Sequence, residues 1–312
     1  MIVGSFATLG GVTQDLPDPR NETIKIHVGG QLVPRDQAGV SVFDSSVQGG
    51  DAVWEGLRVY NGRIFRLENH LERLEASARS LAFKQILPRD EIKRLLFETL
   101  KANEMTDGVH VRLTMTRGVK VTSGMSPRWN QGGPCLIVLA EWKAPADVEK
   151  GQRLVTSAIR RNPPQCIDSK IHHNNLINNI LAKVEADNAG ADDAIMLDVE
   201  GYVAETNATN LFAVKKGVLK TPAADHCLPG ITRGVILDIA RDEKIPHEVR
   251  RISLSEFHSA DEVFTTGTMG GLVWVREIDG RTIGDGNQGP LTKRIRNFFG
   301  ERTRIEGERL PV

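Results

Sequence analysis

Turn dipeptides between short β-rich runs constrain the fold of this 312-residue chain more than any other feature of its sequence. Gly29-Gly30 separates two such runs in "TIKIHVGGQLVPRDQ", and Asn61-Gly62 does the same in "VWEGLRVYNGRIFRL". Both dipeptides favour the two-residue turns that join antiparallel strands. Parallel strands need a crossover helix instead. Together with helices that are segregated from the strands, the turns predict an α+β fold, not a doubly wound sheet.

Helical spacing is clear in several segments. Leu67, Leu71, Leu74 and Ala78 recur at this spacing, and "PRDEIKRLLFETLKANE" predicts a second helix with Pro88 near its first turn. The stretch "DSKIHHNNLINNILAKVEADNAG" (168–190) reads as a lysine at the start of an amphipathic helix, with aliphatic residues on one face, namely Leu176, Ile180, Leu181 and Val184. Further helices are expected in "ITRGVILDIARDE" and "PLTKRIRNFFGERTRI".

A polar stretch with Pro and Gly, "KAPADVEKGQR" (143–153), predicts a linker between two domains. We therefore expect a small N-terminal domain over 1–142, of which 1–22 form a loose leader. The larger C-terminal domain is expected over 154–312.

Composition excludes several classes of function. Lys and Arg total 40, as do Asp and Glu, so the formal net charge is zero and no general electrostatic attraction to nucleic acid or acidic membranes is expected. We see no spanning segment of about 18 apolar residues and no secretory signal. Cys135, Cys166 and Cys227 are widely spaced, with no metal-ligand pattern and no disulfide framework. We expect buried thiols in a reduced, cytoplasmic protein.

Three stretches are typical of anion binding, although each also has a plain structural explanation. Gly230 precedes a helix, so Thr232 is either a cap or a hydroxyl donor to an anion. The segment "TTGTMGG" (265–271) suits a loop around a phosphate or carboxylate, or simply a tight turn. Arg66 either binds phosphate or pairs with a neighbouring glutamate. With Lys170, which alone could be surface charge, they indicate covalently bound pyridoxal phosphate (PLP).

With these segments assembled, the chain resembles the class IV aminotransferases, which are fold-type IV PLP enzymes, from about residue 24 to residue 300. The similarity rests on "SKIHHNNLINNILAKVEA", "DVEGYVAETNATNLFAVKKGVLKTP", "LPGITR", "DEVFTTGT" and "VWEGLRVYNGRIFRLENHLERLEASA". The resemblance implies a small α/β domain and a larger pseudo-barrel PLP domain.

The resemblance also implies roles for individual residues. Lys170 would be the Schiff-base lysine, and Glu205 would face the pyridine nitrogen. The phosphate would be held by Arg66, Ile231, Thr232, Gly267 and Thr268. Branched-chain aminotransferases carry a tyrosine shortly after the lysine, whereas this chain has His172-His173-Asn174-Asn175. Asn175 or Asn174 would therefore take over the hydrogen bond to the cofactor. Adjacent histidines point apart, which disfavours a metal pair.

Substrate residues are expected on the small-domain strands and in the glycine-rich loop. His110 and Arg112 alternate along a strand and so share a face. We expect both to be cationic and to assist the backbone of Thr268, Met269 and Gly270 in binding the substrate carboxylate. The "VWEGLRVY" segment adds Trp54 and Arg58, although Trp54 could equally be core packing.

These features lead us to expect a branched-chain-type aminotransferase that moves an amino group between an amino acid and 2-oxoglutarate. The amino acid is expected to be an L-branched-chain one. Alternatives on the same fold are a D-amino acid or (R)-amine transaminase and an aminodeoxychorismate-type lyase. A silent phosphate-binding protein is a further alternative, which an unreactive Lys170 would support. The resemblance implies a homodimer or higher homo-oligomer, with small-molecule substrates as the other partners.

Overall fold

The computed structural model describes residues 16–144 and 149–311. The chain divides into two compact units. The first comprises Met1–Ala144, His173–Asn175 and Gly307–Val312; the second comprises Pro145–His172 and Leu176–Glu306. Residues 1–15 of the expected leader and residues 145–148 of the expected linker lie outside the described residues.

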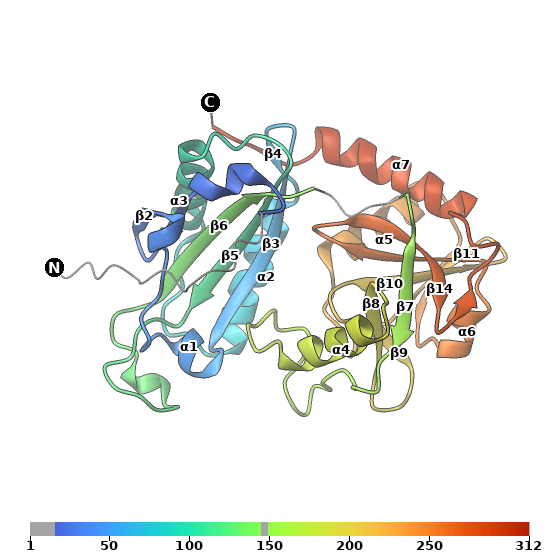
Figure 1. The fold of residues 1–312 in the computed structure, drawn as a ribbon, viewed down its shortest axis with the longest axis horizontal. Helices are drawn as coiled ribbons and strands as arrows, with labels where there is room; N and C mark the ends of the chain where they lie inside the picture. Colours follow the sequence, from blue (N-terminus) through green and yellow to red (C-terminus); the bar gives the residue numbers. More distant parts are fainter. Residues whose placement is uncertain (1–15, 145–148, 312) are drawn as a thin grey trace. The chain divides into compact units, whose positions relative to one another are not determined.

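The first unit is built on an antiparallel sheet with the strand order β16-β4-β3-β5-β6-β1-β2 (Figure 1). Its strands are β1 (Lys25–Val28), β2 (Gln31–Pro34), β3 (Ala52–Tyr60), β4 (Arg63–Ile64), β5 (Val109–Thr116), β6 (Cys135–Trp142) and β16 (Glu308–Arg309). The two predicted turns are confirmed, since Gly29 and Gly30 join β1 to β2 and Asn61 and Gly62 join β3 to β4. All four have positive φ, as such turns require.

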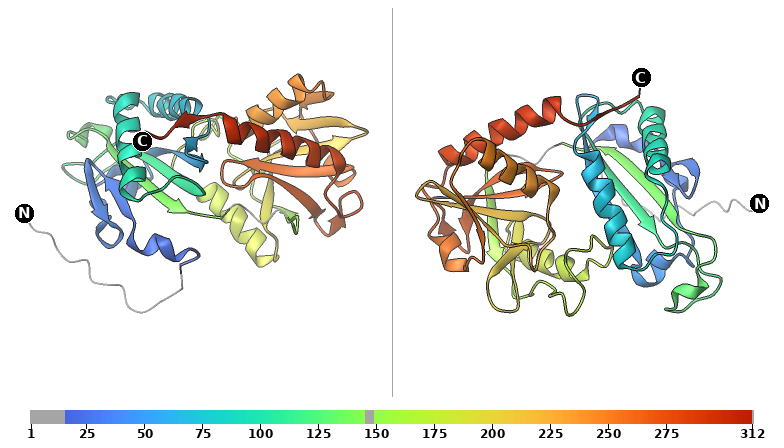
Figure 2. Two further views of the ribbon diagram at one scale, coloured as in Figure 1. Left: turned by 90° about the horizontal axis from the view of Figure 1, so that it is seen from above. Right: turned by 180° about the vertical axis from the view of Figure 1, so that it is seen from behind.

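Helices α2 (Leu67–Ser80) and α3 (Arg89–Ala102) cover one face of this sheet, as the rear view in Figure 2 shows. Their aliphatic residues and alternate strand residues form one core. It includes Leu67, Leu71, Leu74, Leu96, Val53, Leu57, Val59, Val111 and Leu113. Alternation along β3 and β5 therefore directs Trp54, Arg58, His110 and Arg112 to the opposite face of the sheet.

Part of the expected leader is ordered. Residues Pro19–Thr23 form the 3-10 helix η1 instead of a loose segment. Asn21 is buried there, and its side chain exchanges two hydrogen bonds with the backbone of Trp142 in β6. These bonds fix η1 to the end of the interior strand β6, which composition alone did not indicate. Short elements η2 (Arg35–Gln37), α1 (Ser45–Gly49) and η3 (Pro127–Trp129) complete this unit.

The second unit holds a mainly antiparallel sheet with the order β12-β11-β10-β13-β14-β7-β8-β9, and β15 pairs with β14. Its strands are β7 (Gln152–Thr156), β8 (Asp193–Leu197), β9 (Val203–Thr206), β10 (Asn210–Lys215), β11 (Val218–Pro222), β12 (His247–Arg250), β13 (Glu262–Gly267), β14 (Gly271–Ile278) and β15 (Arg281–Thr282). The edge strand β9 also contacts β10 and β11, so the sheet curls into an incomplete barrel. The predicted α+β class and pseudo-barrel are thus confirmed.

Helices cover the outside of the curled sheet. Helix α5 (Ile231–Asp242) packs on β13 and on α7 (Pro290–Ile305), and α7 also contacts β13 and β14. The short helix α6 (Leu254–His258) begins with a capping box formed by Ser253 and Glu256. The predicted helices for α5 and α7 are correct, whereas β12 and α6 were not anticipated.

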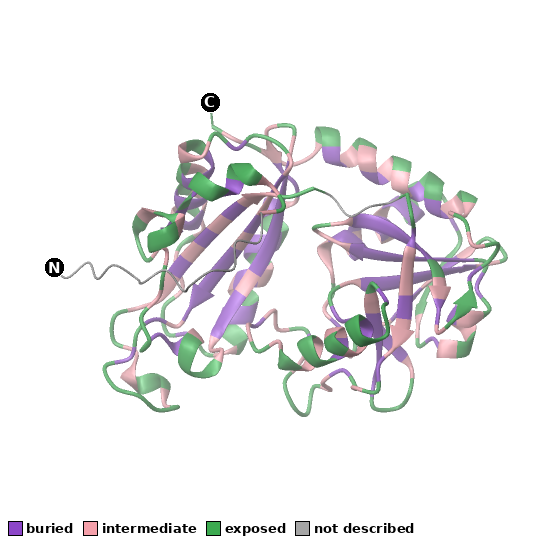
Figure 3. Cartoon of the chain, viewed as in Figure 1, coloured by how far each residue is buried: buried purple, intermediate pink, exposed green. Residues whose placement is uncertain are grey.

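Helix α4 (Ile177–Asn188) turns its aliphatic residues outward, unlike an ordinary amphipathic helix. Its buried residues are Ala182 and Ala186, which pack with Ala191, Ala194 and Met196. Its large aliphatic residues are about half exposed, and α4 is largely green in Figure 3. The predicted helix exists, but its apolar stripe lies outside the core of its unit.

The cysteines only partly match expectation. All three are free; Cys227 is buried and Cys135 half-buried, but Cys166 is exposed, so the prediction of a buried thiol is wrong there. Cys166 lies in the turn 164–166. Within residues 16–144 and 149–311, none of the helices is both long and apolar enough to cross a bilayer.

Candidate active site

Lys170 lies in a turn and not at the start of a helix, which corrects the sequence prediction. Helix α4 begins only at Ile177, and the intervening residues are irregular. The backbone N–H groups of Lys170 and Ile171 donate to Asp168, and the hydroxyl of Ser169 donates to the carbonyl of Asn162. This turn leaves the Lys170 side chain exposed, with no ion pair among the described residues.

Glu205 on β9 is a buried carboxylate that is held on several sides. One oxygen accepts from Arg161 Nε at 2.7 Å and from the backbone N–H of Leu228 at 3.4 Å. The other accepts from Asn210 Nδ2 at 3.2 Å. Arg161 is itself buried, so the ion pair between its guanidinium and the Glu205 carboxylate is shielded from water.

Asn210 connects Glu205 to the start of α5. Its Nδ2 also donates to the carbonyl of Leu228, and its Oδ1 lies where a side chain at position 230 would begin. A Cβ on Gly230 would come within 2.0 Å of that oxygen, so the turn requires glycine. Gly230 is the N-cap of α5, with no side-chain cap, and Thr232 is the second helical residue. Thr232 is therefore not the cap, and the first N–H groups of α5 lack intrahelical partners.

The glycine-rich segment forms the β13–β14 hairpin. Asn210 pairs with Thr266 across β10 and β13, so this hairpin adjoins the same network. Gly267 pairs with Gly271, and Thr268, Met269 and Gly270 form the turn between them. The buried hydroxyl of Thr266 has no hydrogen-bond partner among the described residues. The second unit thus brings the predicted residues Glu205, Ile231, Thr232, Gly267 and Thr268 into one neighbourhood around Asn210.

The lysine turn is tied to this neighbourhood through two adjacent residues. Arg161 holds Glu205, and Asn162 accepts the hydrogen bond of Ser169, which precedes Lys170. Arg161 Nη1 also donates to Asn178 Oδ1 on α4 at 3.2 Å. The second unit therefore connects Lys170 and Glu205 by a short path of hydrogen bonds and neighbouring residues.

In the first unit, Arg112 is held between an aromatic ring and an amide. Its guanidinium lies 3.9 Å from the ring centroid of Trp54, and its Nη2 donates to Asn174 Oδ1 at 3.1 Å. Trp54 Nε1 donates to the carbonyl of His173, and the backbone N–H of Asn174 donates to the carbonyl of Ala52. His173 and Asn174 of the lysine segment are thereby bonded to β3, and Asn174 in turn orients Arg112. Trp54 is thus not simply core packing.

Positive charge accumulates beside Arg112. Arg58 is 3% exposed, and its Nε and Nη1 have no hydrogen-bond partner among the described residues. His110 lies opposite Arg58 on the neighbouring strand. Burial, together with Lys143, Arg58 and Arg112, lowers the pKa of His110 to about 4. His110 is therefore neutral at neutral pH, and the expectation of a cationic His110 is wrong.

Arg66 also belongs to the first unit. It is the N-cap of α2 with φ of 52°, a left-handed conformation that is uncommon for residues other than glycine. Glu68, a suggested partner, pairs instead with Lys93 and Arg89. Strained backbone of this kind clusters at functional sites, so the φ value is compatible with a binding role.

Several residues of the site were not singled out in the sequence. These are Arg161 and Asn210, which hold Glu205. Of the two suggested replacements for the missing tyrosine, Asn174 holds Arg112 and Asn175 is exposed. A buried carboxylate needs a cationic partner, so the sequence could have suggested the arginines of "AIRRNPP" as partners of Glu205. It could not have shown which of the two arginines binds.

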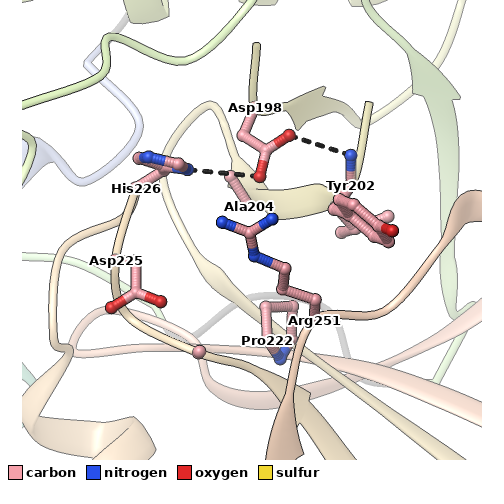
Figure 4. A pocket seen from close by; sticks show the side chains of 9 residues that line it. Asp198, Tyr202, Ala204, Pro222, Asp225, His226 and Arg251 are labelled. Carbon is pink, nitrogen blue, oxygen red and sulfur yellow. Dashed lines mark hydrogen bonds and ion pairs between the residues drawn. The ribbon is translucent and has the colours of Figure 1, made fainter. Parts of the chain in front are cut away.

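A separate small cavity in the second unit is lined by both polar and apolar residues, as Figure 4 shows. Asp198 accepts from the backbone N–H groups of Glu200 and Tyr202 and contacts His226 Nδ1 at 3.2 Å. These bonds close the β8–β9 turn, and none of the predicted site residues lines the cavity. Among the described residues, no group of three or more His, Cys, Asp or Glu could hold a metal ion.

Comparison with known proteins gives the family. Residues 52–278 match the family model described as amino-transferase class IV. This match spans most of the chain and contains the lysine turn, Glu205, the α5 N-terminus and the β13–β14 hairpin. The chain belongs to the class IV aminotransferase family.

Individual relatives extend this result. The chain is 58% identical over 298 residues to branched-chain-amino-acid aminotransferase-like protein 2 of Arabidopsis thaliana, covering 95% of this chain and 53% of that protein. A putative branched-chain-amino-acid aminotransferase of Methanocaldococcus jannaschii is 39% identical, with 88% and 95% covered. A D-alanine aminotransferase of Bacillus licheniformis is 33% identical, with 87% and 94% covered. The chain spans about half the length of the Arabidopsis relatives.

Solved structures agree in fold. A branched-chain amino acid aminotransferase of T.th., solved with pyridoxamine 5′-phosphate, superposes with a TM-score of 0.85 at 34% identity. The match covers 90% of this chain and 94% of that one. The similarity thus includes both units.

Proposed function

We propose that this chain is a PLP-dependent aminotransferase and that its cofactor binds around Glu205. The observation that carries the proposal is the buried Glu205 carboxylate, which is held by Arg161 and Asn210 and adjoins an uncapped helix N-terminus. An ionised acid beside a set of free N–H groups fits a cofactor with a basic ring nitrogen at one end and a phosphate at the other.

The residues of the second unit fit the two ends of such a group. Glu205 would accept a hydrogen bond from the ring nitrogen and keep it protonated. The N–H groups of Ile231 and Thr232 and the hydroxyl of Thr268 would bind the phosphate. Arg66 is assigned to the phosphate by family resemblance alone. When bound, the cofactor supplies an electron sink for the substrate α-carbon.

Lys170 is proposed as the residue that attaches the cofactor and transfers the proton. It is exposed and not engaged in an ion pair among the described residues, so its amine is available for covalent attachment. Once released, its neutral amine would take the proton from the substrate α-carbon.

Borohydride reduction of the PLP-loaded protein, followed by peptide mapping, tests this assignment. We expect a pyridoxyl label on Lys170, which Lys170→Ala abolishes and Lys293→Ala, an exposed control in the same unit, leaves unchanged. A label on a different lysine in the wild type would contradict the proposal. Absence of any label would favour a silent phosphate-binding protein.

L-branched-chain amino acids are the proposed donors, supported by the names of the relatives at 58% and 39% identity. The D-alanine aminotransferase relative supports D-amino acids as the second candidate. Single-turnover absorbance changes with L-leucine, D-alanine and an (R)-amine separate these substrate classes. Pyruvate release from aminodeoxychorismate would instead indicate the lyase.

The keto acid is proposed to be a dicarboxylate such as 2-oxoglutarate. Arg58 and Arg112 share one sheet face and have no carboxylate partner among the described residues, and burial lowers the pKa of both. A second substrate carboxylate would compensate this buried charge. We expect Arg112→Ala to raise KM for 2-oxoglutarate at least tenfold and to raise KM for a monocarboxylate keto acid less. Equal losses would show that Arg112 is structural.

Asn174 should act through Arg112 in the same assay. Asn174→Ala removes the acceptor of Arg112 Nη2, so we expect a smaller rise of KM for 2-oxoglutarate with kcat retained. Asn174→Asp keeps an acceptor but also introduces a charge that competes with the substrate, so its KM should rise further.

The resemblance also supports a homo-oligomer.

A further inference from the structure

The loop of residues 223–230, which joins β11 to α5, lies beside the Glu205 carboxylate. The backbone N–H of Leu228 donates to Glu205 at 3.4 Å, and the carbonyl of Leu228 accepts from Asn210 Nδ2 at 2.9 Å. Gly230 then forms the N-cap of α5, where a Cβ would collide with Asn210 Oδ1. The position of this loop therefore decides where the first N–H groups of α5 lie relative to the carboxylate.

The contact between Leu228 and Glu205 needs support from elsewhere in the loop. Its donor–acceptor distance of 3.4 Å exceeds the range of about 2.7–3.2 Å that is usual for N–H···O bonds, so the bond is weak. The neighbouring Cys227 is buried, but a thiol is only a weak hydrogen-bond donor. Among the described residues, the hydrogen bond that ties 224–227 to another segment comes from the side chain of His226.

His226 bonds to Asp198, which lies in the turn that leads into β9 and Glu205 (Figure 4). Its Nδ1 is 3.2 Å from Asp198 Oδ2, and a carboxylate only accepts, so the ring nitrogen donates. Asp198 is 5% exposed, and its Oδ1 accepts from the backbone N–H groups of Glu200 and Tyr202. A turn that is itself held by hydrogen bonds therefore presents Oδ2 to His226.

Two contacts thus join the same two segments of the chain. The loop 223–230 meets the β8–β9 hairpin at Leu228–Glu205 and again at His226–Asp198. A single contact leaves a loop free to rotate about it, whereas two contacts at different points fix its orientation. Groups that are held in place in this way bind a ligand without first having to be ordered.

We propose that His226 is a positioning residue for the cofactor. Through Asp198 it holds the loop so that the Leu228 N–H meets Glu205 and the first turn of α5 faces the phosphate. This role rests on the proposed function, because it requires PLP beside Glu205. Without the bond from His226, PLP would have to order the loop as it binds, and this cost would reduce its affinity. We therefore expect weaker cofactor binding, not a loss of attachment at Lys170.

Two polar substitutions at position 226 test this role. In His226→Asn the amide nitrogen takes the place of Nδ1 and can still donate to Asp198, whereas in His226→Gln it takes the place of Nε2, away from Asp198. Equilibrium dialysis of the apoproteins against PLP measures the dissociation constant. We expect His226→Asn to stay within about twofold of the wild type and His226→Gln to bind about tenfold more weakly, as the loss of one hydrogen bond to a carboxylate implies. Equal dissociation constants for these two variants would overturn the proposal.

Alanine variants at two histidines separate positioning from general stability. His258 Nε2 lies 3.0 Å from Asp279 Oδ2 in the same unit, in a contact between α6 and the turn after β14. His258→Ala and His226→Ala therefore each break one His–Asp bond. Both should lower the urea midpoint of the apoprotein, but only His226→Ala should raise the PLP dissociation constant. Equal weakening of PLP binding by both variants would show that His226 acts through stability alone.

Peptide mapping of the borohydride-reduced wild type separates this role from the proposed function. A wild type without a label on Lys170 contradicts the proposed function and the role of His226 with it. A wild type labelled on Lys170, together with unchanged PLP binding in His226→Gln and His226→Ala, contradicts the role of His226 alone.

Discussion

Helices α2 and α4 carry the same kind of aliphatic stripe, and the fold places the two stripes in opposite environments. In α2, Leu67, Leu71 and Leu74 are each 1% exposed, because β3 and β5 present Val53, Leu57 and Val111 to them. In α4, Ile180 and its neighbours are about half exposed, and the buried residues are alanines. Periodicity therefore shows that a helix has an apolar face, but not which surface covers it.

The residues on the inner faces explain the difference. Helix α4 packs on β8 through Ala182 and Ala186, opposite Ala194 and Met196. Small residues let the helix lie close to the strand, so no space remains for a leucine-sized side chain on that side. In α2, by contrast, leucine side chains fill the space between the helix and its sheet. We therefore expect a smaller side chain to destabilise the chain in α2. In α4, a larger side chain on the face towards β8 should destabilise it.

The largest expected effect is on α2. Leu71→Ala should lower the free energy of unfolding by about 3 kcal/mol, because it removes a fully buried side chain and leaves a cavity. Urea denaturation at a protein concentration where the chain is monomeric measures this loss. The matched change on α4, Ile180→Ala, should cost less than about 1 kcal/mol there. A loss for Ile180→Ala equal to that for Leu71→Ala would show that Ile180 belongs to the core.

The next largest loss of stability is expected when a small buried residue of α4 is replaced by a larger one. Ala186→Leu should destabilise the chain by about 2 kcal/mol, because the added atoms must push α4 away from β8. On the exposed face, Val184→Leu adds one methylene without a clash and serves as the control. Thermal unfolding of both variants measures the difference. An unchanged melting temperature for Ala186→Leu would mean that space exists under α4.

A pH effect is expected on the sheet face opposite α2. The pKa of His110 is about 4 in the folded chain, below its ordinary value of about 6.5. Between these values the unfolded chain binds a proton that the folded chain does not, so stability falls as pH decreases from 6.5 towards 4. From pH 7 to pH 4.5 the loss assigned to His110 is about 2 kcal/mol.

Urea titrations of wild type and His110→Gln at pH 7 and pH 4.5 check this effect. The variant should lose less stability than the wild type over that interval, whereas His247→Gln, at an exposed position, should behave as the wild type does. Parallel losses in wild type and His110→Gln would show that His110 is already solvated.

Local chemistry made much of the fold predictable. Gly29-Gly30 and Asn61-Gly62 define hairpins because few other residues accept two successive positive φ values. The helices α2, α3, α5 and α7 follow from spacing and from proline near two of their starts. Helix α6 carries a local signal, the capping box of Ser253 and Glu256, that was not used in the prediction. Strand β12 was missed because a short exposed strand depends on a partner far away in the sequence. Strand β12, for example, is held by the parallel partner β11.

By itself, the sequence determined which residue types are available for the chemistry and in what order, including Lys170, Glu205 and the glycine turns before α5 and within β13–β14. Only the tertiary structure decided their surroundings. It placed Arg161 and Asn210 around Glu205, lowered the pKa of His110 and bonded Arg112 to Asn174. It also turned the large aliphatic residues of α4 outward. The physical reason is that charge state and burial are set by neighbours that are distant in the chain, whereas turns and helix faces are set by residues a few positions apart.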